Sequence, residues 1–366
     1  MAESTMPAAS QVGATGESRH PLVSVVVPLY NGGAYIAETL TSIALQAIDR
    51  VEVIVVDDGS DDDGPDLVRA HPVGARLVEQ SHLGVAVARN RGLALARGGW
   101  VAFVDQDDLW HPTHLARAVG WLDAHSGERI VFLRETTFAV GDETDRLRSM
   151  DEAVAGWATV LVGRERTLEE LVESADVSGS DELEIHDLRA LLRGPISATT
   201  SFVADPELLR LAGGFAPHAL AMDDYWMLVN VARLQPVTQV DQPTVFYRVH
   251  VGATSRTTRL GLPFLSSAVA LRLGGGLIGV DEGLAGGIEG KLHRHLFREL
   301  LAAPGYADAR FRGAVGHLAA ILWPPDGRRR ERRRALLAAR LPWLRRATRS
   351  VRTRLAAGTR QRVTSQ

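Results

Sequence analysis

The residues of this sequence most suited to chemistry are three clustered aspartates, Asp105, Asp107 and Asp108. Carboxylates so close together repel one another unless a cation or hydrogen-bond donors stabilise them. Oxygen ligands of this kind suit hard divalent ions such as Mg²⁺ or Mn²⁺. A solvated turn before a helix would be the simpler explanation, but the flanking Phe103-Val104 and Leu109-Trp110 are too apolar for an ordinary surface turn. The cluster therefore predicts a divalent-metal site.

A second acidic cluster, Asp57-Asp58-Gly59-Ser60, stands in an equivalent place. It ends the apolar run 51–56, as the first cluster ends the run 100–104, and both runs are typical of strands buried on both faces. Ligands of parallel sheets bind beyond the carboxyl ends of the strands. We therefore expect both clusters to lie at one edge of a sheet. The segment Asp57–Ser60 can be both a turn that ends the strand and a loop that binds a ligand, because Gly and Ser favour turns.

The elements that must position these residues alternate between strand and helix. Strands are predicted at 23–29, 51–56, 100–104 and 130–133, and helices at 34–46, 85–96 and 111–125. This alternation is typical of βαβ units with a mostly parallel sheet, so the predicted fold class is α/β. Further along we expect a strand at 196–203, helices at 206–211 and 222–234, a turn at 213–215 and a strand at 244–249.

Composition narrows the classes of function. The 366 residues contain no cysteine, which excludes disulfides, cysteine-ligated metals and thiol catalysis. Residues 1–20 lack the apolar run of a signal peptide and are expected to be a disordered leader. Residues 134–195 are rich in Asp and Glu and are expected to form a variable insertion or lid. A mainly helical C-terminal region is predicted for residues 256–326.

An arginine-rich tail is predicted for residues 327–366. The stretch from Arg328 to Gln366 holds 14 of the chain's 41 Lys and Arg residues and one of its 44 Asp and Glu residues. Apolar residues recur within it at helical spacing, so a basic amphipathic helix on an anionic membrane surface is one interpretation. A tail that packs on the acidic body of the same protein is the other. Nucleic-acid binding is not expected, because the body is acidic and Trp343 is the tail's one aromatic residue.

Four segments in order resemble the signatures of family 2 glycosyltransferases. They are Ser24–Asn31 (SVVVPLYN), Val55–Ser60 (VVDDGS), Ala88–Gly92 (ARNRG) and Phe103–Asp108 (FVDQDD). Each segment alone is a weak signal, whereas four in this order with sensible spacing are a strong one. The resemblance covers about Pro21 to Val251. It implies a GT-A domain over residues 21–255, with a Rossmann-like, mostly parallel sheet flanked by helices.

The resemblance also implies which residues meet a nucleotide-sugar donor. Pro28, Tyr30 and Asn31 would line the nucleotide pocket. Asp57 and Asp58 would meet the base and the ribose, because a carboxylate can accept from a ring N–H or a hydroxyl.

Other donor contacts and the metal ligands follow from the same resemblance. Arg89 would face the diphosphate, since a guanidinium matches phosphate geometry, or it would lie on a helix surface. Gln106 would contact the nucleotide, as would Asp105. Asp105 and Asp107 would hold Mn²⁺ or Mg²⁺. In the segment Tyr247–His250, His250 would be a further metal ligand, with a structural histidine as the alternative.

On the acceptor side, the segment around Gly214 and the pair Asp223-Asp224 resemble the corresponding part of the family. There an acidic pair opens a helix, and its second carboxylate is usually the general base, which here is Asp224. The family more often has Glu-Asp, so the Asp-Asp of this sequence is a mild departure. Capping of the helix N-terminus by Asp223 or Asp224 is the alternative.

The predicted function is thus an inverting, metal-dependent glycosyltransferase. It would move a sugar from a UDP- or dTDP-sugar to a hydroxyl of a glycan, glycolipid or small molecule, in cell-surface polysaccharide, glycolipid or secondary-metabolite glycosylation. We expect it in the cytoplasm, with peripheral contact at the inner face of the cell membrane through the tail. A sugar nucleotidyltransferase is one alternative, but no basic residue lies near the loop Tyr30–Gly33. A catalytically inactive nucleotide-sugar-binding module is another, against which the intact carboxylates argue.

Overall fold

The computed structural model of the chain describes residues 22–139, 158–161, 166–180, 182–191, 196–217 and 223–250. The predicted leader, the predicted helical region 256–326 and the arginine-rich tail lie outside these ranges. Across the described residues, no helix has both the length and the apolar character that crossing a bilayer requires.

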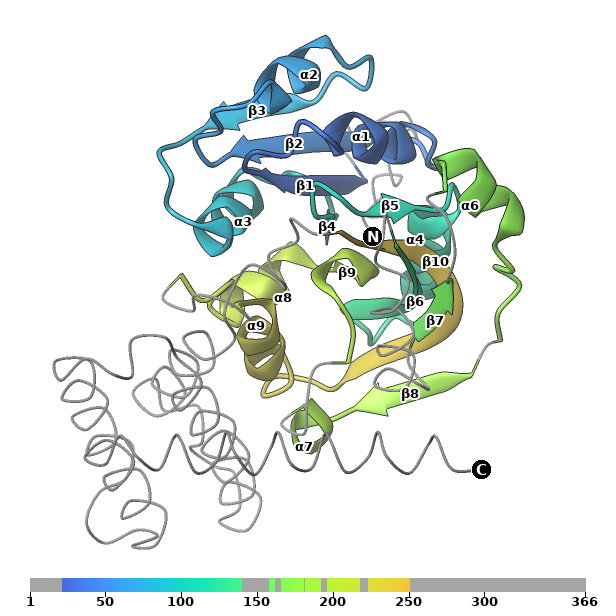
Figure 1. Ribbon diagram of the computed structural model, residues 1–366. Helices are drawn as coiled ribbons and strands as arrows, with labels where there is room; N and C mark the ends of the chain where they lie inside the picture. The colour runs from blue at the N-terminus through green and yellow to red at the C-terminus, as the bar shows by residue number, and fades with distance from the viewer. Residues whose placement is uncertain are drawn as a thin grey trace, which may run out of the picture.

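One ten-stranded sheet organises the described part of the chain (Figure 1). Its strand order is β3-β2-β1-β4-β9-β6-β10-β5, with β7 paired to β6 and β8 paired to β10. The strands are β1 (Val23–Leu29), β2 (Val51–Asp57), β3 (Arg76–Glu79), β4 (Trp100–Phe103), β5 (Leu109–Trp110), β6 (Ile130–Ala139), β7 (Ala158–Leu161), β8 (Leu183–His186), β9 (Phe202–Ala204) and β10 (Val237–Val249).

Most of the pairing is parallel. Strand β1 lies parallel to β2 and β4, β2 to β3, and β6 to both β7 and β10. Strand β9 runs antiparallel between β4 and β6, and β5 and β8 are antiparallel to β10. The predicted α/β class with a mostly parallel sheet is therefore confirmed.

Helices cover both faces of the sheet. One apolar core joins the sheet to α1 (Ile36–Ala44), α2 (Gly64–Ala70) and α4 (His114–Ala124). The core on the other face joins it to α3 (Val85–Leu95), α8 (Pro206–Leu211) and α9 (Asp223–Val231). In Figure 1, α1 and α3 lie on opposite sides of β1. Two further helices, α6 (Leu168–Ser174) and α7 (Leu188–Leu191), and the 3₁₀ turn η1 (Thr199–Ser201) complete the described elements.

Strand β1 shows why these residues form a central strand. All seven of its side chains are buried, and its run of valines favours the extended backbone. Pro28 cannot donate a backbone hydrogen bond. It is tolerated because β4 pairs with β1 only as far as Val26, so that no neighbour on that side needs a donor at Pro28.

Several bounds differ from the sequence prediction. The expected strand 196–203 is a turn that leads into the short β9, and the expected strand 244–249 is the second half of the longer β10. Residues 134–139, which we expected to begin a lid, continue β6 within the sheet. The turn arises because Ser201 donates to the Ala198 carbonyl through both its backbone N–H (3.2 Å) and its hydroxyl (2.6 Å). Such local bonds compete with a strand ladder.

Candidate active site

The candidate site lies where the sheet order reverses, between β1 and β4. From β1 the chain adds β2 and β3 on one side and then returns to place β4 on the other. Crevices form at such reversals, outside the carboxyl ends of the strands. Tyr30 follows β1 and Gln106 follows β4, and the two residues join the strand ends. The Tyr30 N–H donates to Gln106 Oε1 (2.8 Å), and Gln106 Nε2 donates to the Tyr30 carbonyl (3.1 Å).

The loop after β1 is bonded to the loop after β2. Asn31 has φ +49°, in the left-handed region that asparagine tolerates better than most residues. Its N–H donates to Ser60 Oγ (2.9 Å), and its side-chain oxygen accepts from the N–H of Asp61 (2.8 Å). Ser60 Oγ donates in turn to Asp57 Oδ1 (2.5 Å). Asp57 and Asn31 therefore lie together at the edge formed by the ends of β1 and β2.

Asp58 is buried, and its side chain organises the loop before α3. It accepts hydrogen bonds from Gln80 Nε2, from the N–H of Leu83 and from the N–H of Gly84, each at 2.8 Å. His82 Nδ1 lies 3.0 Å from Asp58 Oδ2, and the His82 ring stacks on Tyr30 with centroids 4.1 Å apart. A ribose or base contact by Asp58 would have to share oxygens that already have several donors.

Arg89 joins the two sides of the site. It is 5% exposed, and it donates to Asp105 Oδ1 (2.5 Å) and to Asp223 Oδ2 (2.9 Å). Its guanidinium carbon also lies 5.4 Å from the centre of the Phe215 ring. A diphosphate contact by Arg89, one of the two sequence interpretations, would require one of these ion pairs to open. The alternative, an arginine on a helix surface, does not fit a side chain so deeply buried.

The electrostatics follow from one guanidinium among three carboxylates. Burial alone would lower the pKa of Arg89, but Asp105, Asp223 and Asp224 raise it overall, so the side chain stays charged. Burial raises the pKa of Asp105, against the effect of Arg89 and with that of Asp107. Burial likewise raises the pKa of Asp223, although Arg89 lowers it. The cluster holds more negative charge than Arg89 neutralises.

Asp107 and His250 lie side by side at the end of β10. His250 Nε2 is 2.8 Å from Asp107 Oδ2. Carboxylate and imidazole are both ligands of Mn²⁺ and related divalent ions, which complete their coordination with substrate phosphates and water. Among the described residues, no three His, Asp or Glu side chains gather as a metal site.

Asp108 has an internal role that the sequence did not separate from that of its neighbours. It is 1% exposed, accepting from Thr200 Oγ1 (2.6 Å) and from the N–H of Arg248 (2.9 Å). Burial raises its pKa well above the usual range, and Asp107 and Asp105 raise it further. Asp108 thus fastens β10 and η1 to the acidic loop.

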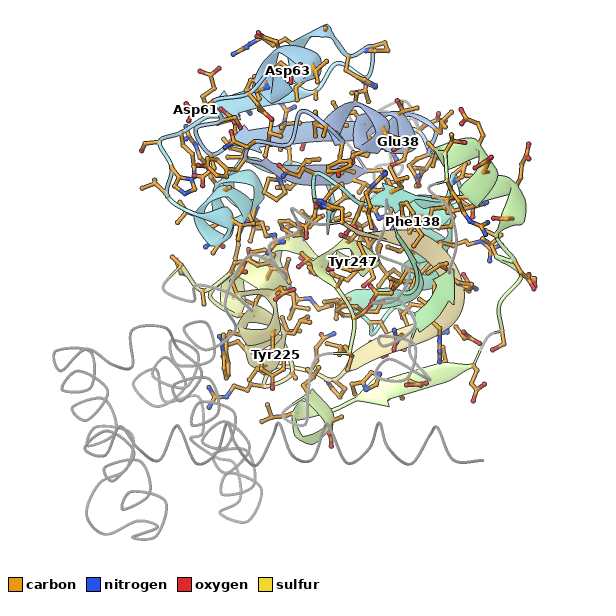
Figure 2. The ribbon with its side chains drawn as sticks, in the orientation of Figure 1. Glu38, Asp61, Asp63, Phe138, Tyr225 and Tyr247 are labelled. Carbon is orange, nitrogen blue, oxygen red and sulfur yellow. The ribbon has the colours of Figure 1, made fainter. Side chains whose placement is uncertain are left out.

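Arg248 supports the same loop from behind. It donates to the Asp107 carbonyl (2.7 Å) and to Glu38 Oε2 (2.6 Å). Its guanidinium carbon lies 5.0 Å and 4.9 Å from the ring centres of Tyr35 and Phe138. Figure 2 labels Glu38 on α1 and Phe138 on β6. Arg248 therefore connects the backbone of the predicted metal-binding loop to α1 and β6.

The acidic pair at the start of α9 divides into two unlike side chains. Asp223 is 4% exposed and paired with Arg89. Asp224 is half-buried, and its Oδ2 accepts from Thr199 Oγ1 (2.8 Å) while its Oδ1 accepts from the N–H of Tyr225 (2.7 Å). A carboxylate has about four acceptor positions, so Asp224 keeps capacity for another hydroxyl.

Gly214 is held against α3. Its φ of +68° favours glycine, and a Cβ there would lie 2.5 Å from Asn90 Oδ1. Asn90 Oδ1 accepts from the N–H of Phe215 (2.8 Å), and Asn90 Nδ2 donates to the Phe215 carbonyl (2.7 Å). The sequence placed Gly214 on the acceptor side, and its visible role is to let this turn dock on the helix that carries Arg89.

Sequence reasoning missed three polar residues of this site: His82, Glu135 and Thr199. Thr199 belongs to the run Ser197–Ser201, whose many hydroxyls were a usable signal. Glu135 stands in the polar middle of β6, next to Arg134 and Thr136, so its charge alone did not mark it as a buried carboxyl. Nothing in the sequence around His82 indicated that its ring would stack on Tyr30.

Comparisons with known proteins agree on one family. Residues 24–180 match the model of Glycosyl transferase family 2. The chain is 38% identical over 94 residues to the uncharacterized glycosyltransferase YibD of Escherichia coli (strain K12), which covers 25% of this chain and 27% of that protein. It is 34% identical over 134 residues to a PGL/p-HBAD biosynthesis glycosyltransferase of Mycobacterium bovis (strain BCG / Pasteur 1173P2), which covers 34% and 52%. The chain thus spans about half or less of these two relatives.

The fold is also similar to that of solved structures. Residues 1–349 of S. aureus TarS, in complex with UDP-GlcNAc, match with a TM-score of 0.53 and 18% identity, over 82% of this chain and 81% of that chain. This likeness confirms the predicted GT-A fold.

Proposed function

We propose that this chain, which matches the model of Glycosyl transferase family 2 over residues 24–180, transfers a sugar from a nucleotide-diphosphate donor to an acceptor hydroxyl, with inversion at the anomeric carbon. The observation that carries the proposal is the buried bridge Asp105–Arg89–Asp223. It joins the edge beyond β1, β2 and β4 to the start of α9, where Asp224 lies. A donor and an acceptor bound on the two sides would therefore meet between them.

The donor would bind over the strand ends. Tyr30 is 41% exposed and offers a ring for the base, with His82 stacked beside it. Asp57 and Asn31 border the same edge, and Asp105 and Gln106 close it from the side of β4. The relative from S. aureus was solved with UDP-GlcNAc, which makes a UDP-sugar a reasonable first donor to test and dTDP-sugars the second.

A divalent metal would be held by Asp107 and His250, with Asp105 near them. When bound, Mn²⁺ or Mg²⁺ would neutralise charge on the departing nucleoside diphosphate. Arg248 fixes the Asp107 backbone, and Glu38 fixes Arg248, so the ligand pair is oriented by the fold.

Asp224 would act as the general base on the acceptor side. An inverting displacement needs one base that takes the proton of the attacking hydroxyl, and a carboxylate with free acceptor capacity suits this role. Asp223 suits it less, because its carboxylate is paired with Arg89 and almost fully buried. Asp223 would instead hold Arg89 in place.

The structure of the loop after β1 disfavours the sugar nucleotidyltransferase alternative. Such an enzyme would cradle triphosphate with free backbone N–H groups of a glycine-rich loop. Here the N–H groups of Tyr30, Asn31 and Gly33 donate to Gln106, Ser60 and Asp62. The acidic Asp62 at this loop would also repel phosphate. Radiolabelled UDP-sugar would separate the two activities: a transferase releases UDP, whereas a nucleotidyltransferase acts on pyrophosphate.

Binding of the donor can be tested before the acceptor is known. We expect UDP or dTDP to raise the melting temperature in the presence of Mn²⁺, because ligands that bind only the native state stabilise it. Slow hydrolysis of the donor without acceptor would separate an active enzyme from an inactive binding module. If neither nucleoside diphosphates nor intact donors shift the melting temperature, the proposed donor class is wrong.

Metal dependence has its own variant. Asp107→Ala should lower transfer about 10³-fold, since a metal at the leaving group contributes several kcal/mol to the transition state. Donor binding should weaken chiefly when Mn²⁺ is present. Asp61→Ala, which removes an exposed carboxylate of the neighbouring loop, is the matched control. Full activity in excess EDTA would exclude the metal.

A further inference from the structure

Glu135 is a buried carboxyl on β6 behind the proposed base. It is 3% exposed. Its Oε2 accepts from the N–H of Ala198 (3.2 Å) and from Ser197 Oγ (3.4 Å), both of which are neutral donors. Among the described residues no cation is shown paired with Glu135, and a carboxyl buried in this way is costly to a fold, so its presence calls for a physical explanation.

The two donors belong to the segment that holds Asp224. Ala198 directly precedes η1, whose first residue, Thr199, donates to Asp224 Oδ2 at 2.8 Å. Ser197 Oγ lies 2.6 Å from Ser201 Oγ, so the turn is also closed upon itself. Glu135 therefore fastens a compact turn to the sheet, and this turn presents one hydroxyl to the carboxylate of Asp224.

The two carboxyls also interact through space. Burial and the negative charge of Asp224 raise the pKa of Glu135, the hydrogen bonds from Ala198 and Ser197 lower it, and the net result is a pKa of about 7. Asp224 is the ionisable neighbour with which Glu135 interacts, although the two lie on different elements. Position and charge therefore both connect Glu135 to the start of α9.

We propose that Glu135 is a positioning residue for Asp224, acting through Ala198 and Thr199 to aim the carboxylate at the acceptor hydroxyl. The inference rests on the proposed role of Asp224 as base. Glu135 itself touches neither substrate. Its carboxyl sets where the turn 197–201 lies, and the Thr199 hydroxyl then holds one oxygen of Asp224 while leaving acceptor capacity for the incoming hydroxyl.

The first test compares Glu135→Ala with Glu135→Gln. Alanine removes the acceptor for Ala198 and Ser197, and we expect kcat to fall about 10- to 100-fold with little change in the KM for the donor, because a shifted base misaligns the reacting groups. Glutamine retains an acceptor oxygen and should recover most of the loss. Glu169→Ala, at an exposed position of α6, is the control and should keep kcat. A rise in donor KM with unchanged kcat would overturn the proposal.

The second test is a double-mutant cycle with Asp224→Asn. If Glu135 acts through Asp224, Glu135→Ala should add little to the loss caused by Asp224→Asn, and Thr199→Val should likewise be non-additive with Glu135→Ala. Full additivity would mean that Glu135 has only a general structural effect, and the positioning role would be wrong. Near-normal kcat in Asp224→Asn would instead refute the proposed base itself. Should Glu135→Ala fail to fold, the cycle of Thr199→Val with Asp224→Asn tests the same path of contacts, and full additivity there would likewise contradict the positioning role.

Discussion

Two Asp-Asp pairs in this protein have different partners, although the sequence makes them look alike. Asp57 and Asp58, after β2, are both buried and accept from hydroxyl, amide and backbone N–H groups, and the His82 ring also lies beside Asp58. The pair at the start of α9 includes Asp223, which is paired with the charged Arg89. Its neighbour Asp224 is half-buried and accepts from one threonine hydroxyl and one backbone N–H.

The difference indicates separate physical roles. The hydrogen bonds to Asp58 determine the shape of the loop before α3, and we propose that a nucleotide would contact this loop. At α9 the ion pair with Asp223 fixes the position of the Arg89 side chain, because Asp105 also pairs with Arg89 from the opposite side. The carboxylate that is left with spare acceptor capacity is the one best suited to chemistry.

The largest expected effect on stability comes from removing Arg89, which bridges Asp105 and Asp223. Arg89→Met should lower the free energy of unfolding by about 3–5 kcal/mol, because it leaves the buried Asp223 and the partly buried Asp105 without their cation. Arg97→Met provides the control. Arg97 pairs with Glu52 but its side chain is 65% exposed, so the expected loss is about 0–1 kcal/mol. Urea unfolding monitored by tryptophan fluorescence would measure both, and equal losses would contradict a special role for the bridge.

A smaller effect should appear as a pH dependence at Glu135. Its pKa is raised to about 7 in the folded protein, mainly by burial, so folding favours the protonated form. The stability it contributes is present below its unfolded pKa and is lost as pH rises through about 7. Over that window the loss amounts to about 3 kcal/mol by proton linkage.

Glu135→Gln should remove this dependence. The variant's free energy of unfolding, relative to the wild type, should therefore rise by about 3 kcal/mol between pH 4.5 and 7.5. Glu169→Gln, at an exposed position, should show a constant difference from the wild type. A pH-independent difference for Glu135→Gln would mean that the carboxyl is not buried as described.

The smallest effect is expected at the first pair. Asp58→Asn retains one acceptor oxygen but places an amide against a backbone N–H, which should cost about 1–2 kcal/mol of stability. Because the loop before α3 would shift, the affinity for nucleoside diphosphate should fall more than kcat does. Asp61→Asn is the exposed control. A loss of kcat as large as that of an Asp224 variant would remove the distinction between the two pairs.

The sequence predicted features that depend on neighbouring residues better than features that depend on residues far apart in the chain. The buried runs of β1, β2 and β4 and the acidic residues after them follow from local pattern, and the fold class was predicted correctly, whereas the site at these strand ends remains a prediction. The division of labour between Asp223 and Asp224 was suggested only by a resemblance. That Arg89 pairs with Asp223, 134 positions away, depends on packing that no local pattern contains.

The turn before β9 is a local feature that the sequence prediction nevertheless missed. The run 196–203 was expected to be a strand, but Ser201 bonds to the Ala198 carbonyl through its hydroxyl and its N–H and so makes a turn. That turn is what brings Thr199 to Asp224 and Ala198 to Glu135. Hydroxyl-rich runs next to a predicted catalytic carboxylate are therefore better treated as candidate supporting turns than as strands.

The most direct test of the account compares kcat in Asp224→Asn and Asp223→Asn with donor affinity measured in parallel. We expect Asp224→Asn to lower kcat about 10²–10⁴-fold, as for loss of a general base, while metal-dependent donor binding stays nearly unchanged. Asp223→Asn should retain more of kcat and show its loss in thermal stability instead. Near-normal turnover in Asp224→Asn, or a larger loss of kcat in Asp223→Asn, would contradict the assignment of Asp224 as the base.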